Sequence, residues 1–513
     1  MIALIFKQNC HKKAGLLFLG VGFFVCGVYQ RQGKLIIRIG KENLLQDKRK
    51  AAVIATSGNP SIFSSQDTYN LREEMRVNRR KRLSFLLLIC IFLLPVAATG
   101  QTAPYNYPIV DPIAATILST PAQDMAPLPR EIRAKHYQTI DIFPDRVIPD
   151  VFWYNHKLRY SVAYHKEKAP VMFLIAGTGA GYDSGKMEIM QKAFFQAGFH
   201  VVALSSPTHP NFIVAASSSG MPGDIRSDAA DLYNVMNKIF QQNKHKELAG
   251  DFYLTGYSLG GSQAAFVAKL DEEKKVFNFK KVMMINPALN IYDSAVKLDK
   301  ILIDNIPGGI ANFNTFYLKL IDNLTNAYVE GDFIDLSHGF FYSAYHKILP
   351  SQSEGKAVIG LSFRVSLANL LFTADVMTNS GYIVPKNLKL YRTDSLTDYL
   401  KVVSRGHGFK EYVEEILYPV FKAREPGLSL RELVDRSSLR TIESYLRTST
   451  KIGLVTNVDD FILAPGDIDY FKRIFGSRAK IYPQGGHCGN MGYKDNVIYM
   501  IDFFTKSIEH QRQ

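Results

Sequence analysis

Three side chains of the types that cleave acyl bonds follow one another along this chain: Ser258, an aspartate after a late apolar run, and His487. A serine hydroxyl is a weak nucleophile until a base takes its proton. An imidazole serves as that base when a carboxylate fixes its tautomer and stabilises its positive charge. Residues of these types therefore predict acyl transfer through a serine nucleophile, provided that the fold brings the three together.

Ser258 lies at the centre of the sequence Gly256-Tyr257-Ser258-Leu259-Gly260. The apolar run before it is typical of a β-strand, and the small residues after it favour the start of a helix. A serine at the apex of a tight strand-turn-helix lifts its hydroxyl off the sheet, and the glycines let the segments approach closely. The pattern predicts that Ser258 is the nucleophile; an ordinary glycine-rich helix start is the structural alternative.

His487 lies in the stretch Gly485-Gly486-His487-Cys488-Gly489, between a short apolar run and the last helical pattern. The glycines allow this loop to turn the imidazole toward the serine, so we predict that His487 is the base. The structural alternative is one of 12 histidines in an ordinary loop. Cys488 is interpreted as a packing residue, because its neighbour already has the catalytic assignment.

The elements that must position these residues follow from hydrophobic patterning. Continuous apolar runs, as in Ala169 to Ala176, are typical of strands buried on both faces. Runs of this kind alternate with helical patterns, which indicates an α/β protein with a mostly parallel sheet and helices on both faces. Two further strands, from His136 to Ile142 and from Val151 to Ala163, are expected at an antiparallel edge.

The alternation stops near Pro287, and residues 288–450 are aromatic-rich and mainly helical in pattern. A segment of this length is far longer than an ordinary connection between strands. We therefore predict a helical cap over the active site, inserted between core segments 136–287 and 451–513. Residues 101–135, rich in Pro, Ala and Thr, are expected to form an extended lead-in.

The sequence GYSLGG, the distant GGHCG and the aspartate after a late strand resemble the α/β-hydrolase superfamily, over about residues 151–508. The resemblance implies the chain order serine, acid, histidine. In this family the acid lies two residues before an Ile or Val, which favours Asp460 through Ile462. Asp459 is the alternative acid, and Asp293, after the preceding strand, is a further one.

The resemblance also implies an oxyanion hole made of two backbone N–H groups, one after the nucleophile and one in the loop after the first buried parallel strand. These are Leu259 and Thr178. Gly177-Thr178-Gly179 stands where many relatives have His-Gly, so the position matches and the residue type differs. In the loop after the next strand, His209 either contacts substrate or holds loop geometry.

Other binding chemistry has little support. The glycine-rich run around Thr178 lacks the Lys-Ser/Thr ending of a phosphate-binding P-loop. No Cys/His/Asp cluster has the spacing of a metal site, so we predict no metal and no cofactor.

The formal charge of +14 belongs mostly to the N-terminus. Residues 1–100 hold 16 Lys and Arg against 5 Asp and Glu, and the remaining residues hold 45 against 42. With no nucleic-acid motif in the nearly balanced remainder, no nucleic acid is expected as a partner.

A targeting signal is predicted in residues 75–100. Four basic residues, 79–82, precede an apolar run and then a stretch of small residues, which is the order of a secretory signal peptide. We therefore expect translation to start at Met75, with residues 1–74 as an upstream extension.

The alternative takes Met1 as the start, with residues 75–100 acting as an uncleaved membrane anchor. The apolar residues 14–28 are short for a span, which needs roughly 20 residues, so they are expected to form either a marginal membrane helix or a second signal-like segment. Both interpretations predict an exported protein, either periplasmic or secreted, or attached to the membrane through its N-terminal hydrophobic segments.

The predicted function is a serine esterase or lipase-like hydrolase. The apolar, aromatic-rich cap favours a hydrophobic small-molecule or lipid-like acyl substrate. A peptidase or amidase and an acyltransferase would use the same three side chains. A catalytically silent, hydrolase-like binding protein is the alternative from a different class.

Overall fold

The computed structural model describes residues 27–31, 34–38, 105–319 and 351–509. The predicted signal peptide or anchor of residues 75–100 lies outside these ranges, as does most of segments 1–74 and 14–28. Within segment 1–74 the structure describes a two-stranded sheet of β1 (Gly27–Arg31) and β2 (Lys34–Arg38).

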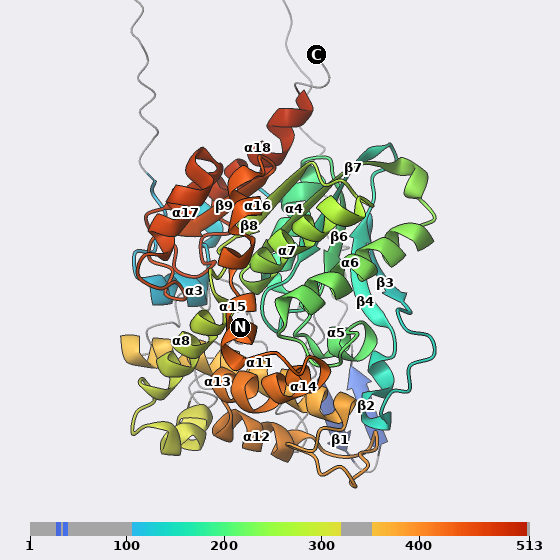
Figure 1. Ribbon diagram of the computed structural model, residues 1–513, viewed down its shortest axis with the longest axis vertical. Coiled ribbons are helices and arrows are strands. Elements are labelled where there is room, and N and C mark those ends of the chain that lie inside the picture. Colours follow the sequence, from blue (N-terminus) through green and yellow to red (C-terminus); the bar gives the residue numbers. More distant parts are fainter. Residues whose placement is uncertain (1–26, 32–33, 39–104, 320–350, 510–513) are drawn as a thin grey trace, which may run out of the picture. The chain divides into compact units, whose positions relative to one another are not determined.

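An eight-stranded sheet runs through the described residues from 135 to 482 in the order β10-β9-β8-β7-β5-β6-β4-β3 (Figure 1). Neighbouring strands from β10 to β6 are parallel, and β4 is antiparallel to both β6 and β3. The predicted mostly parallel sheet is thus confirmed. The strands are β3 (Lys135–Ile140), β4 (Leu158–Ala163), β5 (Ala169–Ile175), β6 (His200–Leu204), β7 (Ala249–Tyr257), β8 (Lys281–Ile285), β9 (Ile452–Asn457) and β10 (Ala479–Tyr482).

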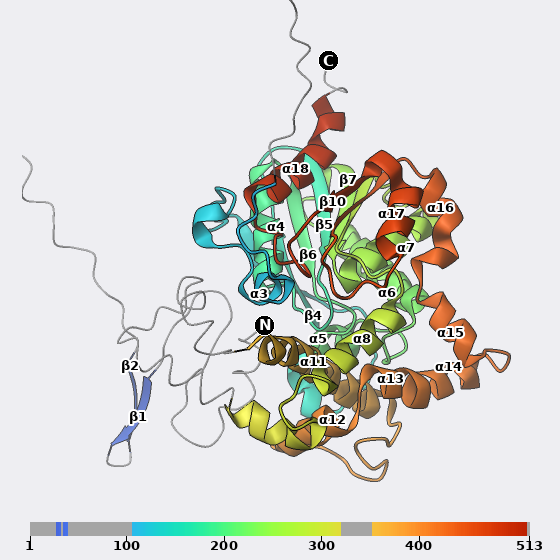
Figure 2. The same cartoon turned by 90° about the vertical axis from the view of Figure 1, so that its left-hand side faces the viewer.

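Helices cover both faces of this sheet (Figure 2). On one face, α4 (Gly185–Gln196) contacts β5 and β6, and α18 (Lys494–Glu509) packs against α4. On the other face, α6 (Ile225–Gln242) packs against α7 (Leu259–Lys274), which contacts β5, β7 and β8. Every residue of β6 and β9 is buried. Burial on both faces explains why most residues of these strands are apolar.

The segment expected to be an extended lead-in contains a helix, α3 (Pro112–Leu118). Asp111 is its N-cap, and the Asp111 side chain accepts a hydrogen bond from the backbone N–H of Ala114 at 2.7 Å. Proline at the first helical position fits this geometry, since its missing N–H would have no partner there. The Asp-Pro pair thus marks the start of a helix that is too short to show a clear hydrophobic periodicity.

The edge strand expected from Val151 to Ala163 is shorter than predicted. Residues Asp150–Asn155 form the 3-10 helix η2, and β4 begins only at Leu158. Pro149 lies just before η2, and its carbonyl accepts a hydrogen bond from the N–H of Phe152 at 2.8 Å. Buried Val151 and Phe152 pack into a hydrophobic cluster with Phe372 and Leu390.

Residues 286–451 join β8 to β9, and the regular elements in the described part of this helical insertion are helices. A buried ion pair between Arg364 and Asp299, 3.0 Å apart, ties two of them together. The elements are α8 (Ile291–Ile303), η4 (Ile310–Asn312), α11 (Gln352–Thr378), α12 (Thr397–Gly406), α13 (Phe409–Glu411), η5 (Tyr412–Leu417), α14 (Tyr418–Arg424), α15 (Leu430–Arg436), η6 (Leu439–Ile442) and α16 (Glu443–Thr448).

Among the described residues, α11 is the one helix long and apolar enough to cross a membrane. Within an apolar 18-residue stretch of this helix, 83% of the residues are buried inside the protein. Leu367, Leu371 and Ala374 of this helix belong to a hydrophobic cluster with residues of α12 to α15. The apolar surface of α11 therefore packs against other side chains of the helical insertion.

Candidate active site

Ser258 lies at a sharp turn between β7 and α7. Its backbone has φ 55° and ψ −126°, a conformation that residues other than glycine rarely adopt. The backbone N–H of Ser258 donates to the carbonyl of Ile285 at 2.8 Å, which fixes the turn at the end of β8. The side chain is therefore presented at the carboxyl edge of the parallel strands.

The glycines around Ser258 are required by close backbone contacts. A Cβ on Gly256 would lie 2.3 Å from the carbonyl oxygen of Gly260. A Cβ on Gly260 would lie 2.5 Å from the carbonyl oxygen of Ile175, on the neighbouring strand. Any larger residue would push α7 away from the sheet, so the sequence pattern reflects the geometry of the turn.

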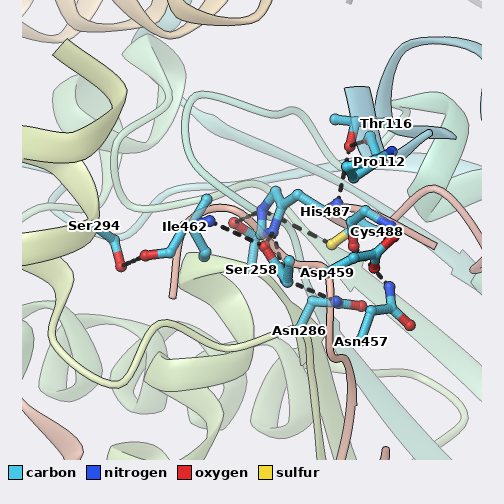
Figure 3. Close-up of polar contacts among 12 residues, drawn as sticks. Pro112, Thr116, Ser258, Asn286, Ser294, Asn457, Asp459, Ile462, His487 and Cys488 are labelled. Atoms are coloured by element: carbon cyan, nitrogen blue, oxygen red, sulfur yellow. Dashed lines mark hydrogen bonds and ion pairs between the residues drawn. The ribbon is translucent and has the colours of Figure 1, made fainter. Parts of the chain in front are cut away.

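The structure brings Ser258, His487 and Asp460 together. Figure 3 shows Ser258 beside His487. Both carboxylate oxygens of Asp460 lie 3.0 Å from Nδ1 of His487, and Nε2 of His487 lies 2.8 Å from Oγ of Ser258. A carboxylate only accepts, so it fixes the tautomer with the proton on Nδ1, and the serine hydroxyl then donates to Nε2. All three side chains are buried.

Of the three candidate acids, Asp460 is the one in contact with His487. Its Oδ2 also accepts from the Nδ2 of Asn286 at 2.8 Å, and its Oδ1 accepts from the N–H of Ile462 at 3.2 Å. Asp293 instead lies in the first turn of α8, where its N–H donates to Asn290.

Asp459 contacts the backbone of the loop that carries His487. Its two carboxylate oxygens accept from the backbone N–H groups of Gly485 and Gly486, at 3.1 Å and 2.9 Å. Burial raises the pKa of Asp459, while the two backbone donors oppose that shift. The two adjacent aspartates thus have separate contacts: one reaches the imidazole and the other reaches the backbone that carries it.

Two opposing effects act on the pKa of His487. Burial lowers the pKa, because the imidazolium loses its hydration, whereas the nearby Asp460 carboxylate raises it. The effect of the carboxylate is the larger one, so the pKa of His487 lies above its usual value of about 6.5. The site therefore stabilises the imidazolium that forms when the histidine takes a proton from Ser258.

The loop that carries His487 is also fixed by α3, which lies far away in the sequence. Thr116 donates its hydroxyl proton to the carbonyl of Pro112 at 2.7 Å, and the same Oγ1 accepts from the backbone N–H of His487 at 2.9 Å (Figure 3). Gly486 has φ 56°, and a Cβ there would lie 2.2 Å from the Pro112 carbonyl oxygen. The loop and α3 are therefore in direct backbone contact.

A pair of side-chain amides closes the other side of this loop. Asn457, at the end of β9, donates to the carbonyl of Gly486 at 2.7 Å and to Oδ1 of Asn490 at 3.0 Å. Asn490 returns a hydrogen bond to Oδ1 of Asn457 at 2.7 Å. Both amides are buried, so this reciprocal pair resists loop movement in the low-dielectric interior.

The expected oxyanion groups, Leu259 and Thr178, line the same cavity as Ser258 and His487. In the described part of the chain, neither backbone N–H donates to another loop residue. The adjacent Gly179 N–H does have an acceptor, Oγ1 of Thr208 at 2.8 Å. This contact anchors the loop after β5 beside Thr178.

His209 holds loop geometry. It is the N-cap of α5 (Pro210–Ala215), and its Nδ1 accepts from the backbone N–H of Asn211 at 3.2 Å. The neighbouring hydroxyls of Ser206 and Thr208 lie 2.8 Å apart and support the loop after β5. In this loop, Thr208 contacts the backbone next to the proposed oxyanion group, because its Oγ1 accepts from the N–H of Gly179.

Cys488 is buried, as a packing residue would be, and has φ 60°. Its Sγ lies 3.9 Å from Nε2 of His487, and its carbonyl accepts from Nζ of Lys186 at 3.0 Å. Among the described residues, no three His, Cys, Asp or Glu side chains are grouped so that they could hold a metal ion.

A cavity of about 90 Å³ opens between Ser258 and the helical insertion. Its lining is mostly apolar, with one carboxylate, Asp228, which accepts from the N–H of Gly223 at 3.1 Å. Burial raises the pKa of Asp228 well above its usual range. Residues of the helical insertion that line the cavity are Ala288, Ile291, Tyr292, Ser294, Ala295, Leu298, Phe363, Leu370, Phe409, Tyr412, Val413, Leu417, Leu433, Val434 and Ser437.

Sequence reasoning missed Thr116, Asn286 and the role of Asp459 as a backbone acceptor. Asn286 directly follows β8, whose carboxyl end meets the same sheet edge as β7, so its place after a strand was a usable signal. Thr116 had no local signal beyond the Asp-Pro helix start, because its partner lies 371 positions away.

The strand order, the serine turn and the acid and histidine that follow it in sequence define the α/β-hydrolase fold, and the chain has this fold. No family model matches the sequence, and no curated protein matches it.

Solved structures are similar at low identity. Est1E from Butyrivibrio proteoclasticus is 12% identical, with 72% of this chain and 99% of that chain covered and a TM-score of 0.33. A Pyrococcus furiosus esterase is 9% identical, with 74% and 98% covered and a TM-score of 0.36. A thioesterase domain from the curacin biosynthetic pathway is 12% identical, with 72% and 99% covered and a TM-score of 0.31. At these TM-scores the fold assignment rests on this protein's own sheet and serine turn.

Proposed function

We propose that this protein is a serine hydrolase that cleaves a carboxylic ester, or a thioester, through an acyl-enzyme on Ser258. The observation that carries the proposal is the 2.8 Å contact between the Ser258 hydroxyl and Nε2 of His487. The other ring nitrogen of His487, Nδ1, contacts the Asp460 carboxylate. A nucleophile, a base and an orienting carboxylate in this arrangement are the parts that acyl transfer requires.

In the first half of the reaction, Oγ of Ser258 attacks the substrate carbonyl while Nε2 of His487 takes the hydroxyl proton. The carbonyl oxygen becomes an oxyanion that accepts from the N–H groups of Leu259 and Thr178. Collapse of this intermediate breaks the bond to the leaving alcohol or thiol, which receives the proton from His487. The acyl group remains on Ser258.

In the second half, water takes the place of the leaving group. His487 removes a proton from water as it attacks the acyl carbon, and the proton then passes to Oγ of Ser258 as the acid product leaves. Asp460 stays ionised throughout and stabilises the imidazolium in both halves. The apolar cavity lining supports a hydrophobic acyl group, with the helical insertion acting as a cap over it.

Labelling and mutation test this proposal directly. A fluorophosphonate probe should label wild-type protein, and Ser258→Ala should abolish both labelling and ester hydrolysis, with a loss on the order of 10⁶-fold. Ser262→Ala is the matched control, since it removes another buried hydroxyl of α7 that donates to the Ala288 carbonyl. Full turnover by Ser258→Ala would refute the mechanism.

A substrate panel separates the related activities. Esters of increasing acyl length, thioesters, peptide anilides and esters with an added alcohol acceptor should be compared in one assay. We expect hydrolysis of apolar acyl esters to be fastest. Faster cleavage of anilides would indicate a peptidase or amidase, transfer to the alcohol would indicate an acyltransferase, and failure to label Ser258 would indicate a binding protein.

We also propose that the protein is exported, on the basis of the signal-like sequence in residues 75–100. Mass spectrometry of the native N-terminus tests this proposal. A mature chain beginning near residue 101 is expected, and tryptic peptides from residues 1–74 would contradict a start at Met75.

A further inference from the structure

One region of the described surface concentrates aromatic and basic side chains. Fifteen large hydrophobic residues of the described chain are exposed, and six of them fall within residues 147–154 and 382–391. Scattered exposed hydrophobics are ordinary, whereas a cluster from two distant segments marks an interaction site. The Trp153 patch is defined here as Trp153, Tyr154, Lys386, Leu388, Lys389 and Tyr391.

Direct contacts join the two segments. Arg392 donates to the Asp150 carboxylate, with Nη2 to Oδ1 at 2.6 Å, and its guanidinium carbon lies 5.7 Å from the centre of the Trp153 ring. The rings of Trp153 and Tyr154 meet edge to face, 5.8 Å apart. The two aromatic side chains are 54% and 49% exposed, so they are held in place and still open to solvent.

The loop between α11 and α12 is fixed from within. The buried Asp375 carboxylate accepts from the N–H groups of Tyr382, Ile383 and Val384 at 2.8 to 3.0 Å. At the other end, Asp394 accepts from the N–H of Tyr391 at 2.8 Å. These two carboxylates accept from four backbone N–H groups and so hold the loop that presents the exposed side chains.

Basic side chains outnumber acidic ones in the loop of residues 379–396, where Asp394 is the one acidic residue. Residues 376–393 contain Lys386, Lys389 and Arg392 and no Asp or Glu. Both lysines are exposed, and Nζ of Lys389 lies 5.5 Å from the centre of the Tyr391 ring. Trp and Tyr favour the membrane–water interface, where Lys and Arg are attracted to anionic headgroups and keep their charges in the headgroup layer.

We propose that the Trp153 patch docks on the surface of an anionic lipid bilayer. The aromatic rings enter the headgroup layer, and Lys386 and Lys389 pair with lipid phosphates. The site is independent of the acyl-transfer chemistry proposed above, so either proposal can fail alone.

The protein carries its own probe for this site, because Trp153 is the only tryptophan in 513 residues. The full chain should be titrated with vesicles of phosphatidylglycerol and, separately, of phosphatidylcholine, while tryptophan emission is followed. We expect a blue shift with the anionic vesicles that weakens as salt is added. The emission reports the patch itself, even when N-terminal hydrophobic segments also bind the vesicles.

Charge reversal tests the electrostatic part. Each lysine near an anionic surface contributes about 1 kcal/mol, so Lys386→Glu with Lys389→Glu should weaken the fluorescence-detected binding at least about 25-fold. Lys244→Glu with Lys246→Glu is the matched control, since it changes net charge equally at two other exposed lysines. Both variants should keep the wild-type unfolding transition.

Outcomes of three kinds would overturn the proposal. The first is an unchanged Trp153 emission with anionic vesicles. The second is equal binding to zwitterionic and anionic vesicles, or equal loss in the two charge-reversal variants. The third is the same blue shift with soluble polyglutamate, which would indicate an acidic polypeptide as the partner.

Discussion

Thr116 accepts a hydrogen bond from the backbone N–H of His487 at 2.9 Å, across 371 positions of sequence. The contact ties α3, which precedes the sheet, to the loop that carries the proposed base after the last strand. The Thr116 hydroxyl is itself oriented because it donates to the Pro112 carbonyl. Helix α3 is therefore one of the elements that hold the site in place.

Replacing Thr116 tests that support. Thr116→Val keeps the shape and leaves the buried His487 N–H without its acceptor, which should lower the free energy of unfolding by about 1–3 kcal/mol. Displacement of the imidazole should also lower kcat/KM, by about tenfold or more. Urea unfolding and ester hydrolysis measure the two effects. Thr116→Ser retains the hydroxyl and should behave as wild type; a valine variant equal to the serine variant would exclude this role.

The two adjacent aspartates should respond differently to the same isosteric change. Asp460→Asn removes the charge beside His487 and should lower kcat by about 10⁴-fold, as expected when the base loses its orienting carboxylate. Asp459→Asn retains one acceptor for the Gly485 and Gly486 amides, so its loss in kcat should be about tenfold or less. Side-by-side kcat values decide the assignment, and a reversed order would identify Asp459 as the acid.

The pH dependence of activity follows from the pKa of His487. The base must be neutral, so activity is lost as pH falls through its pKa, and the raised pKa places that acid limb above about pH 6.5. Asp460→Asn removes the carboxylate that raises the pKa of His487, so the effect of burial, which lowers this pKa, is opposed less. The limb of the residual activity should then move to lower pH. A profile of kcat/KM against pH measures both positions, and a limb that stays fixed would show that another group titrates.

The close contact at Gly260 predicts a sensitive position in the turn. Gly260→Ala places a Cβ 2.5 Å from the Ile175 carbonyl oxygen, so α7 must move and the free energy of unfolding should fall by roughly 1–3 kcal/mol. Fluorophosphonate labelling of Ser258 should fall with it. Gly185→Ala is the control, because nothing lies within 4 Å of its Cβ and alanine favours the helix. Equal stability of the two variants would argue against a strained turn.

Much of the fold followed from local patterns. β5 occupies the residues where the apolar run from Ala169 to Ala176 predicted a strand, because a strand buried on both faces needs a continuous apolar run. The strand predicted for residues Val151 to Asn155 was wrong, since an apolar, aromatic stretch fits a strand and a 3-10 turn equally well. Short helices such as α3 are hard to recognise because one or two turns carry little periodicity.

By itself the sequence determined the chemistry available to this protein: a serine in a glycine-bounded turn, an aspartate pair, and a histidine between glycines, in that order. These are local facts of residue type and spacing. The tertiary structure decided which aspartate meets the imidazole, that Asp459 holds the loop backbone, and that Thr116 and Asn286 support the arrangement. Hydrogen bonds are short-ranged and directional, so they depend on where distant segments meet in space, and residue order along the chain does not specify those meetings.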